Sequence, residues 1–357
     1  MELPPTVADF EARAAELLDP GPLGYYAGGA GDEHTLRDNV AAWSRLAIRP
    51  RVMADVSAID PSTTLLGERR RHPIVVAPTA FQRLATPDAE CATVRAALAT
   101  DTIYTLSTLA TSSCGEVAEA APECRRWFQL YVFKDRGVTR ELVSQAVEHG
   151  YEALVVTVDM PVVGVRERDL RSGFVVGDAT AVPMAAEGGA TGTLSMPELF
   201  ELIDRSLSWD DIEDFASASG LPVIVKGVII PEDARRACES GAAGVVVSNH
   251  GGRQLDTVLS GADALPGVVE EVGDEIEVLV DGGIRRGTDV LKALALGARA
   301  VLVGRPILWG LACGGEAGAR RVLEILRAEF ETALALAGCP SAADLDETWV
   351  TKAPWTP

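Results

Sequence analysis

The sequence lacks the cysteine spacing of a metal site or a redox pair. None of its six cysteines stands in a Cys-x-x-Cys or Cys/His arrangement, which zinc sites and thioredoxin-like centres require. We therefore expect no bound metal and small, reduced thiols in the core. Basic residues are also scarce, because 32 lysines and arginines stand against 52 acidic residues. The net charge of −20 disfavours binding to nucleic acid or anionic membranes, so an anionic substrate must meet a local cluster of cationic side chains.

Long uncharged apolar runs are absent as well. No stretch approaches the roughly 20 apolar residues that span a bilayer, and Met1 to Pro5 lacks the basic segment of a secretory leader. We expect a cytoplasmic protein without a membrane insertion or a haem domain. What is present is a chain of 357 residues, 47% of them hydrophobic, which is long enough to bury one large core. We therefore expect a single domain over residues 1–357.

Eight short apolar runs alternate with helical, alanine-rich stretches. The runs are 73–79, 102–107, 127–131, 153–159, 222–226, 244–249, 277–281 and 300–304. A parallel sheet buried on both faces requires such strands, and eight of them fit a closed barrel. We predict an α/β fold, a TIM (β/α)8 barrel over 71–340, with an N-terminal helical extension over 1–70 and a tail over 341–357. Active sites of this fold lie at the carboxyl ends of the strands.

The segments between the runs predict helices and one long loop. We expect helices over 87–99 and 138–148, from residue 231 onward, and over 288–296 and 316–337. The glycine- and alanine-rich stretch 173–193 follows the fourth strand. Long loops in compact domains are usually lids or functional excursions, although an insertion without a role is the alternative.

A glycine-rich turn follows the sixth run. Residues 248–256 read Ser-Asn-His-Gly-Gly-Arg-Gln-Leu-Asp, so His250 and Arg253 can hold a base and an anion-binding guanidinium over one ligand. Taken alone, a histidine at a strand end is more often structural. The loops 281–287 and 304–306 follow the last two runs and place backbone N–H groups and arginines beside helix starts, which suits a phosphate. Glycine turns that serve chain geometry alone are the alternative.

These residues resemble a family. The chain is similar to the FMN-dependent 2-hydroxy acid oxidases and dehydrogenases of the glycolate oxidase type, which include lactate oxidase and mandelate dehydrogenase. The resemblance rests on nine ordered segments: 25–33, 49–51, 77–80, 128–131, 157–159, 225–227, 248–256, 281–283 and 304–306. It implies FMN as the cofactor, oxidation of an (S)-2-hydroxy acid to a 2-oxo acid, and a homotetramer or homo-octamer.

The resemblance also implies roles for individual residues. His250 would be the catalytic base, oriented by Asp159. It would take its proton either from carbon, through a carbanion, or from the hydroxyl, with hydride transfer to the flavin. Substrate-binding residues would be Tyr25, Tyr131, Arg166 and Arg253, with Leu109 beside the substrate side chain. The cofactor would be bound by Pro78, Thr79, Ala80, Ser107, Gln129, Thr157, Lys226, Ser248, Asp281, Gly282, Gly283, Arg285, Gly304 and Arg305.

Departures from the family pattern bear on the substrate and the electron acceptor. Leu109 stands where glycolate oxidases usually carry tryptophan, which predicts a substrate bulkier than glycolate, either a longer aliphatic acid or an aryl acid such as mandelate. Phe81 would add an aromatic wall or pack in the core. Ala80 matches the oxidases and favours O2 as the acceptor, with hydrogen peroxide as the product.

Three other functions stay open at this point. One is a flavin dehydrogenase that passes electrons to a quinone or a protein. Another is a barrel that binds a phosphate ligand without redox chemistry. The third is a different FMN or nucleotide barrel, which predicts a catalytic cysteine or an NAD-site motif that the sequence does not contain.

Overall fold

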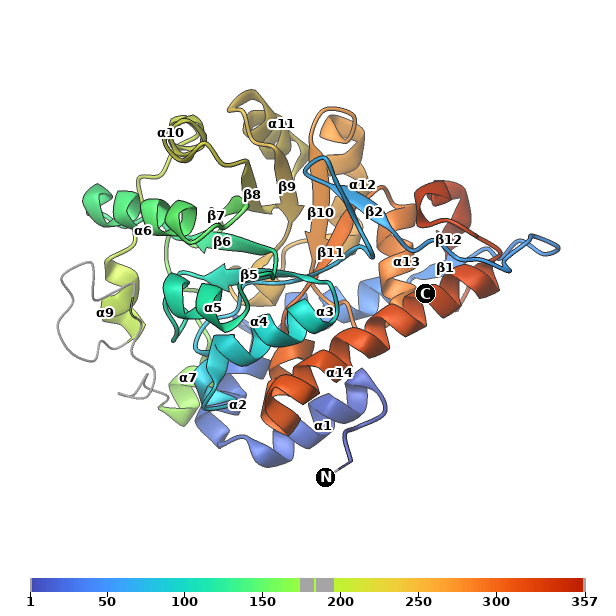
Figure 1. Cartoon of the computed structure of the whole chain (residues 1–357), viewed down its shortest axis with the longest axis horizontal. Coiled ribbons are helices and arrows are strands. Elements are labelled where there is room, and N and C mark those ends of the chain that lie inside the picture. Colours follow the sequence, from blue (N-terminus) through green and yellow to red (C-terminus); the bar gives the residue numbers. More distant parts are fainter. Residues whose placement is uncertain (1, 174–182, 184–195, 356–357) are drawn as a thin grey trace.

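Eight parallel strands close into a barrel in the computed structural model, which describes residues 2–173, 183 and 196–355 (Figure 1). Around the barrel the strands follow the order β10-β11-β4-β5-β6-β7-β8-β9. Their bounds are β4 (Ile74–Val76), β5 (Ile103–Ser107), β6 (Arg126–Leu130), β7 (Ala153–Thr157), β8 (Val223–Val228), β9 (Gly244–Val247), β10 (Glu277–Asp281) and β11 (Ala300–Val303). Each coincides with one of the eight apolar runs, so the predicted TIM barrel is confirmed.

The barrel interior is packed with side chains that come from every strand. Every strand contributes at least one buried residue to this inner cluster, among them Val75, Ile103, Trp127, Val155, Ile224, Val246, Leu279 and Leu302. Their strand neighbours face outward onto the helices, which is why both faces must be apolar. A hairpin of β2 (Thr63–Leu65) and β3 (Glu68–Arg70) adds Leu65 to the cluster. The amide of Leu66 there donates to Glu277, the first residue of β10, so the hairpin covers the amino end of the barrel.

Helices surround the strands, and most follow a strand directly. They are α4 (Ala89–Ala99), α5 (Cys114–Ala120), α6 (Arg136–Glu148), α7 (Glu167–Ser172), α9 (Met196–Glu201), α10 (Asp210–Ser219), α11 (Pro231–Glu239), α12 (Gly261–Val272), α13 (Gly287–Ala295) and α14 (Arg305–Ala337). The sequence predicts the last helix only from residue 316, but α14 begins at Arg305. Gly314 and Gly315 leave the helical conformation, so this pair obscures the continuity of the helix in the sequence. No helix among the described residues is long and apolar enough to cross a membrane.

The N-terminal extension is helical only in its first part. It contains α1 (Val7–Leu17), α2 (Pro20–Ala27) and α3 (His34–Ser44), and α1 lies beside α14 in Figure 1. The prediction of a helical extension up to residue 70 is wrong after Ser44. There β1 (Leu46–Ile48) pairs antiparallel with β12 (Val350–Lys352) near the C-terminus, which draws this part of the chain into an extended conformation. Short 3-10 turns complete the structure: Gln82–Leu84, His250–Gly252, Ala342–Asp344 and Glu347–Trp349. The loop predicted over 173–193 lies almost wholly outside the described residues.

Candidate active site

A cavity of about 1000 Å³ lies at the carboxyl ends of the strands. Except for Asp159 and Ser248, every residue predicted to bind a ligand or to act in catalysis lines this cavity. The two exceptions lie directly behind His250. Asp159 accepts from its ring, and Ser248 accepts from its backbone amide at 3.1 Å. Thus the structure brings together residues that are up to 280 positions apart in the sequence, counting from Tyr25 to Arg305.

The turn that carries His250 has an unusual backbone. Three consecutive residues, His250, Gly251 and Gly252, have φ values of 59°, 64° and 74°, a left-handed conformation that is uncommon for a residue other than glycine. The Asn249 side chain accepts from the Gly252 amide at 3.0 Å. The side-chain amides of Asn249 and Asn39 also exchange two hydrogen bonds, of 2.9 and 2.8 Å. Helix α3, through Asn39, therefore fixes the turn, a role that no sequence motif indicates.

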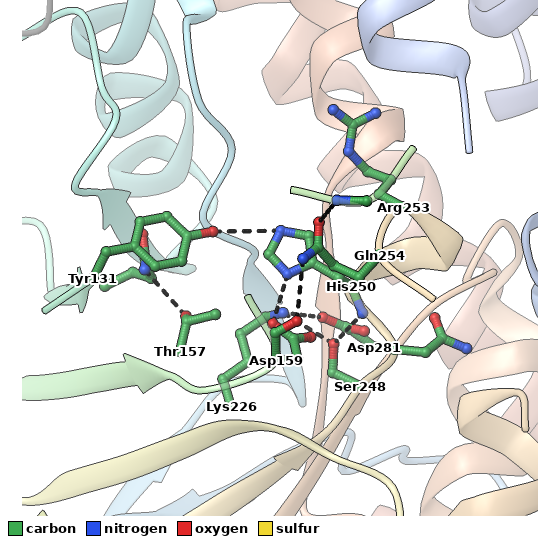
Figure 2. A network of polar contacts seen from close by, with 12 residues as sticks. Tyr131, Thr157, Asp159, Lys226, Ser248, His250, Arg253, Gln254 and Asp281 are labelled. Carbon is green, nitrogen blue, oxygen red and sulfur yellow. Dashed lines mark hydrogen bonds and ion pairs between the residues drawn. The ribbon is translucent and has the colours of Figure 1, made fainter. Parts of the chain in front are cut away.

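His250 lies between a carboxylate and a phenol. Its Nδ1 is 2.8 Å from Asp159 Oδ1, and its Nε2 is 3.4 Å from the Tyr131 hydroxyl. Figure 2 shows these two partners at different nitrogens of the ring. Because a carboxylate accepts, Nδ1 carries the proton, and Nε2 is left as the acceptor.

The buried position of His250 favours its neutral form. Burial lowers the pKa of His250, and Lys226 and Arg166 lower it further, whereas Asp159 opposes them. Burial alone would raise the pKa of Asp159, but His250 and Lys226 outweigh it and hold that pKa below its usual value. At neutral pH the pair is therefore an imidazole beside a carboxylate, which is the state a general base requires.

The close approach of Asp159 to strand β8 depends on Gly227. This residue has φ of 112°, and a Cβ placed on it would lie 2.6 Å from the Asp159 Cβ. Such a distance is far shorter than van der Waals contact, so any side chain at this position must push Asp159 away from His250.

We expect Gly227→Ala to lower kcat by about 10²-fold, the loss that a displacement of about 1 Å produces in a catalytic group. Absorbance of bound FMN per chain, measured beside kcat, should stay near the wild-type value. Gly220→Ala is a matched control, since Gly220 also has positive φ, of 66°, but open space around its Cβ position. Equal losses in both variants would mean that backbone strain, and not Asp159, is responsible.

Lys226 is buried at 4% exposure and does not reach solvent. Its Nζ lies 3.0 Å from Asp281 Oδ2 and donates to Ser248 Oγ at 2.9 Å. Burial would lower the pKa of Lys226, but Asp281 and Asp159 raise it above its ordinary value. The lysine is thus a permanent cation inside the cavity. The other oxygen of Asp281, Oδ1, is buried and has no hydrogen-bond partner among the described residues.

Arg166 and Arg253 form a cationic pair around one aromatic ring. Their Cζ atoms lie 5.8 and 4.7 Å from the centroid of the Tyr25 ring. Nη1 of Arg253 donates to the carbonyl oxygens of Tyr25 and Gly28. Burial, together with the charge of Arg166, lowers the pKa of Arg253 to about 10. No carboxylate among the described residues is within ion-pair distance of either arginine, so the pair can accept an anion.

A second pair of arginines lies over the last two strands. The Arg305 guanidinium donates to the carbonyls of Tyr26, Gly251 and Gly28 at 2.9 to 3.0 Å, and burial holds the pKa of both Arg305 and Arg285 below the ordinary range.

The loop after β10 brings backbone groups to the same place. Its Gly283 has φ of 78°, and a Cβ there would lie 1.8 Å from the Asn39 carbonyl oxygen. Glycine is therefore required at this position. Backbone N–H groups beside buried guanidiniums form the kind of site that binds phosphate.

The side-chain amide of Gln129 connects the polar residues along one edge of the cavity. Gln129 donates to Thr157 Oγ1 at 3.1 Å and accepts from Ser107 Oγ at 3.2 Å. The amide of Thr108 also donates to Gln129, at 3.1 Å. The Gln129 side chain therefore has a fixed orientation.

The apolar wall contains residues that the sequence does not single out. Leu109 lines the cavity as predicted, and Met160 and Phe200 join it. Phe200 lies on α9, far from every motif, and only its hydrophobicity could have suggested it. Phe81 does not line the cavity, because its ring is fully buried behind Tyr25, with a centroid separation of 5.6 Å. Of the two alternatives for Phe81, the structure supports core packing.

The arrangement can bind two anionic groups and move one proton. His250 shares the cavity with Arg166 and Arg253, and Arg285, Arg305 and the buried Lys226 line the same cavity. A carboxylate would meet no competing carboxylate at Arg166 and Arg253 among the described residues. A ligand that carries a phosphate would meet Arg305 and Arg285, of which Arg285 is paired with Glu11 only at 3.9 Å.

Known proteins are similar to this chain in sequence and in structure. A family model described as FMN-dependent dehydrogenase matches residues 14–352. The chain is 47% identical over 361 residues to 2-hydroxyacid oxidase 1 of Homo sapiens, with 98% of this chain and 96% of that protein covered. It is 46% identical over 357 residues to an L-lactate oxidase of Nostoc sp., with 97% and 98% covered. A crystal structure of a mandelate oxidase with (S)-4-hydroxymandelic acid superposes with a TM-score of 0.88 at 41% identity, covering 95% and 96% of the two chains.

Proposed function

Because the chain belongs to the FMN-dependent dehydrogenase family and is an FMN-dependent oxidoreductase, we propose that it oxidises an (S)-2-hydroxy acid with O2 as the electron acceptor. The balanced reaction is R–CHOH–COO⁻ + O2 → R–CO–COO⁻ + H2O2. The observation that carries the proposal is the neutral base His250 beside the Arg166 and Arg253 guanidiniums, which have no carboxylate partner in the described part of the chain. A 2-hydroxy acid has the two groups that this arrangement needs, an anchorable carboxylate and a proton to lose.

The residues around the cavity fit FMN. Arg305 and Arg285 would hold its phosphate, and the unpartnered Asp281 oxygen would accept from a ribityl hydroxyl. Lys226, Gln129 and the backbone of residues 78–80 would hold the ring system. When bound, FMN supplies the two-electron acceptor that no amino-acid side chain can provide.

The protein side chains then position the substrate and take its proton. Arg166 and Arg253 bind the carboxylate, and the hydroxyls of Tyr25 and Tyr131 donate to substrate oxygens. These contacts orient the reacting carbon of the substrate, and such positioning supplies a large part of an enzyme's rate enhancement. His250 accepts the released proton at Nε2. Asp159 stabilises the imidazolium that results, because it already accepts from Nδ1.

The pH dependence follows from this assignment. Only neutral His250 can accept the proton, so kcat/KM should rise as pH increases through the pKa of His250. Asp159 raises that pKa, so its replacement by asparagine should move the rising limb to lower pH. The plateau should fall by about 10²-fold, within the range that a positioned acid–base group contributes. A profile of kcat/KM against pH for Asp159→Asn would contradict the assignment if the limb moved to higher pH.

We further propose that the substrate is bulkier than glycolate. Leu109, Met160 and Phe200 give the cavity an apolar end, which suits a longer aliphatic or aryl side chain such as that of mandelate. The test is a panel of glycolate, lactate, longer 2-hydroxy acids and mandelate, assayed on the wild type and on Leu109→Trp. The indole should lower kcat/KM for mandelate relative to glycolate by about 10- to 100-fold, the usual range for steric discrimination in a pocket. A wild type that prefers glycolate, with no change of order in the variant, would refute this proposal.

A further inference from the structure

A second cavity lies behind one wall of the active site. It is partly open to solvent and measures about 1020 Å³, beyond the ends of β7 and β8 and against residues 203–212. Nine of its fifteen lining residues are apolar: Val132, Val158, Met160, Pro161, Ile203, Leu207, Trp209, Ile212 and Val228. Helix α10, which contributes Ile212, lies above β8 in Figure 1.

The active-site cavity and the second cavity are separated by residues that line both. Thr157 and Met160 line both of them, so the partition is one residue thick at these positions. Thr157 accepts from Gln129 on the active-site side. Gly227 also lines the second cavity, and its backbone packs against Asp159. The second cavity therefore comes within one residue of the cofactor edge and of the catalytic pair.

The second cavity is not built for an ionic ligand. Its three charged lining residues are all ion-paired: Asp204 with Arg136 at 2.8 Å, Asp233 with Arg236 at 3.8 Å, and Arg205 with Glu201. By contrast, the active-site cavity is lined by four arginines that attract anions. A substrate carboxylate bound by Arg166 and Arg253 would fill part of the active-site cavity but would leave the second cavity free. A small neutral molecule can then approach from the second cavity.

We propose that the second cavity is the route by which O2 reaches the active site. Dioxygen is apolar and small, and apolar cavities bind such molecules, as they bind xenon. The inference rests on the proposed function, in which O2 takes up two electrons and two protons and leaves as H2O2. The two hydrogens of H2O2 are those that the substrate loses from its carbon and its hydroxyl, so no further reactant is needed. Met160 and Thr157 form the last barrier on this route.

Filling the second cavity with a larger side chain should slow reoxidation of the reduced flavin by O2, but not its reduction by substrate. We would compare Leu207→Trp and Ile212→Trp with Ala218→Trp. Ala218 lies on the exposed side of helix α10, which also contains Ile212, and Leu207 precedes that helix. After anaerobic reduction by substrate, the second-order rate constant for reoxidation by O2 should fall by about tenfold in the first two variants, equivalent to about 1.4 kcal/mol of barrier. The rate of reduction and the FMN content should match those of the wild type and of Ala218→Trp. Leu207 is only half-buried, so its replacement tests the idea even if Ile212→Trp fails to fold.

A second measurement does not depend on turnover. Crystals of the wild type under xenon pressure should show xenon between Met160 and Leu207, and crystals of Leu207→Trp should not. Unchanged reoxidation in both filled variants, or equal losses in both half-reactions, would overturn the inference. A higher KM for bulky substrates with unchanged reoxidation would also overturn it and assign the space to the substrate. Slow reoxidation of the wild type itself would refute O2 as the acceptor. That result would contradict the proposed function, and it would be seen before any variant is made.

Discussion

Replacement of His250 by asparagine is expected to lower kcat by about 10² to 10⁴-fold while FMN stays bound, since a positioned general base contributes about this much. Asparagine is chosen because it tolerates left-handed backbone better than other residues, and His250 has φ of 59°. Its amide can still donate to Asp159, but it cannot accept a proton as imidazole does. The backbone conformation of the turn should therefore be retained, whereas proton transfer from the substrate should be lost.

Anaerobic stopped-flow reduction by substrate measures this loss directly. Bound FMN per chain and the melting temperature are the controls, because Arg305 donates to the Gly251 carbonyl in the same turn and a collapsed turn would release the cofactor. A variant that keeps FMN and is reduced at more than a tenth of the wild-type rate would rule out His250 as the base.

Replacement of Arg253 by lysine is expected to raise the KM for the hydroxy acid by about 10- to 100-fold, the effect of losing charge-assisted hydrogen bonds worth roughly 1.5–3 kcal/mol. Lysine retains the charge but not the planar fork that can hold a carboxylate at two points. Nη1 of Arg253 is already engaged by Tyr25 and Gly28, so only its remaining nitrogens are available to the substrate. A single ammonium group cannot donate to the Tyr25 and Gly28 carbonyls and also hold the substrate carboxylate as a guanidinium does.

The matched control for Arg253 is a change in the ligand. A 2-hydroxy amide has no carboxylate, so its weak turnover should be nearly the same in the wild type and in Arg253→Lys. A similar loss for the acid and for the amide would indicate that the variant has displaced Tyr25, and that Arg253 is not the carboxylate anchor.

The barrel and much of the site could be predicted because they follow from short-range patterns. Each strand is an apolar run, and Thr157, Lys226, Asp281 and Arg305 lie at strand ends or within two residues of them, where the closed topology must gather them. The turn at His250 was identifiable for the same reason.

The remaining features depend on contacts that no local pattern encodes. Asn39 supports the catalytic turn from a helix 210 residues earlier in the chain, and Gly227 is required only because Asp159 packs against it. Phe200 enters the cavity from α9, which has no motif. The start of α14 at Arg305 was hidden by two glycines, although this helix start places Arg305 over the cavity.

Anaerobic reduction followed by reoxidation shows whether this cavity couples oxidation of a 2-hydroxy acid to reduction of O2. The holoenzyme is mixed without air with an excess of (S)-mandelate or (S)-lactate, the visible flavin absorbance is followed, and substrate is then removed before a known amount of O2 is added. We expect rapid bleaching, rapid recovery with O2, and one H2O2 for each flavin reoxidised. Flavin that stays oxidised with every 2-hydroxy acid, or that bleaches but recovers only with a quinone or a protein acceptor, would contradict the proposed function.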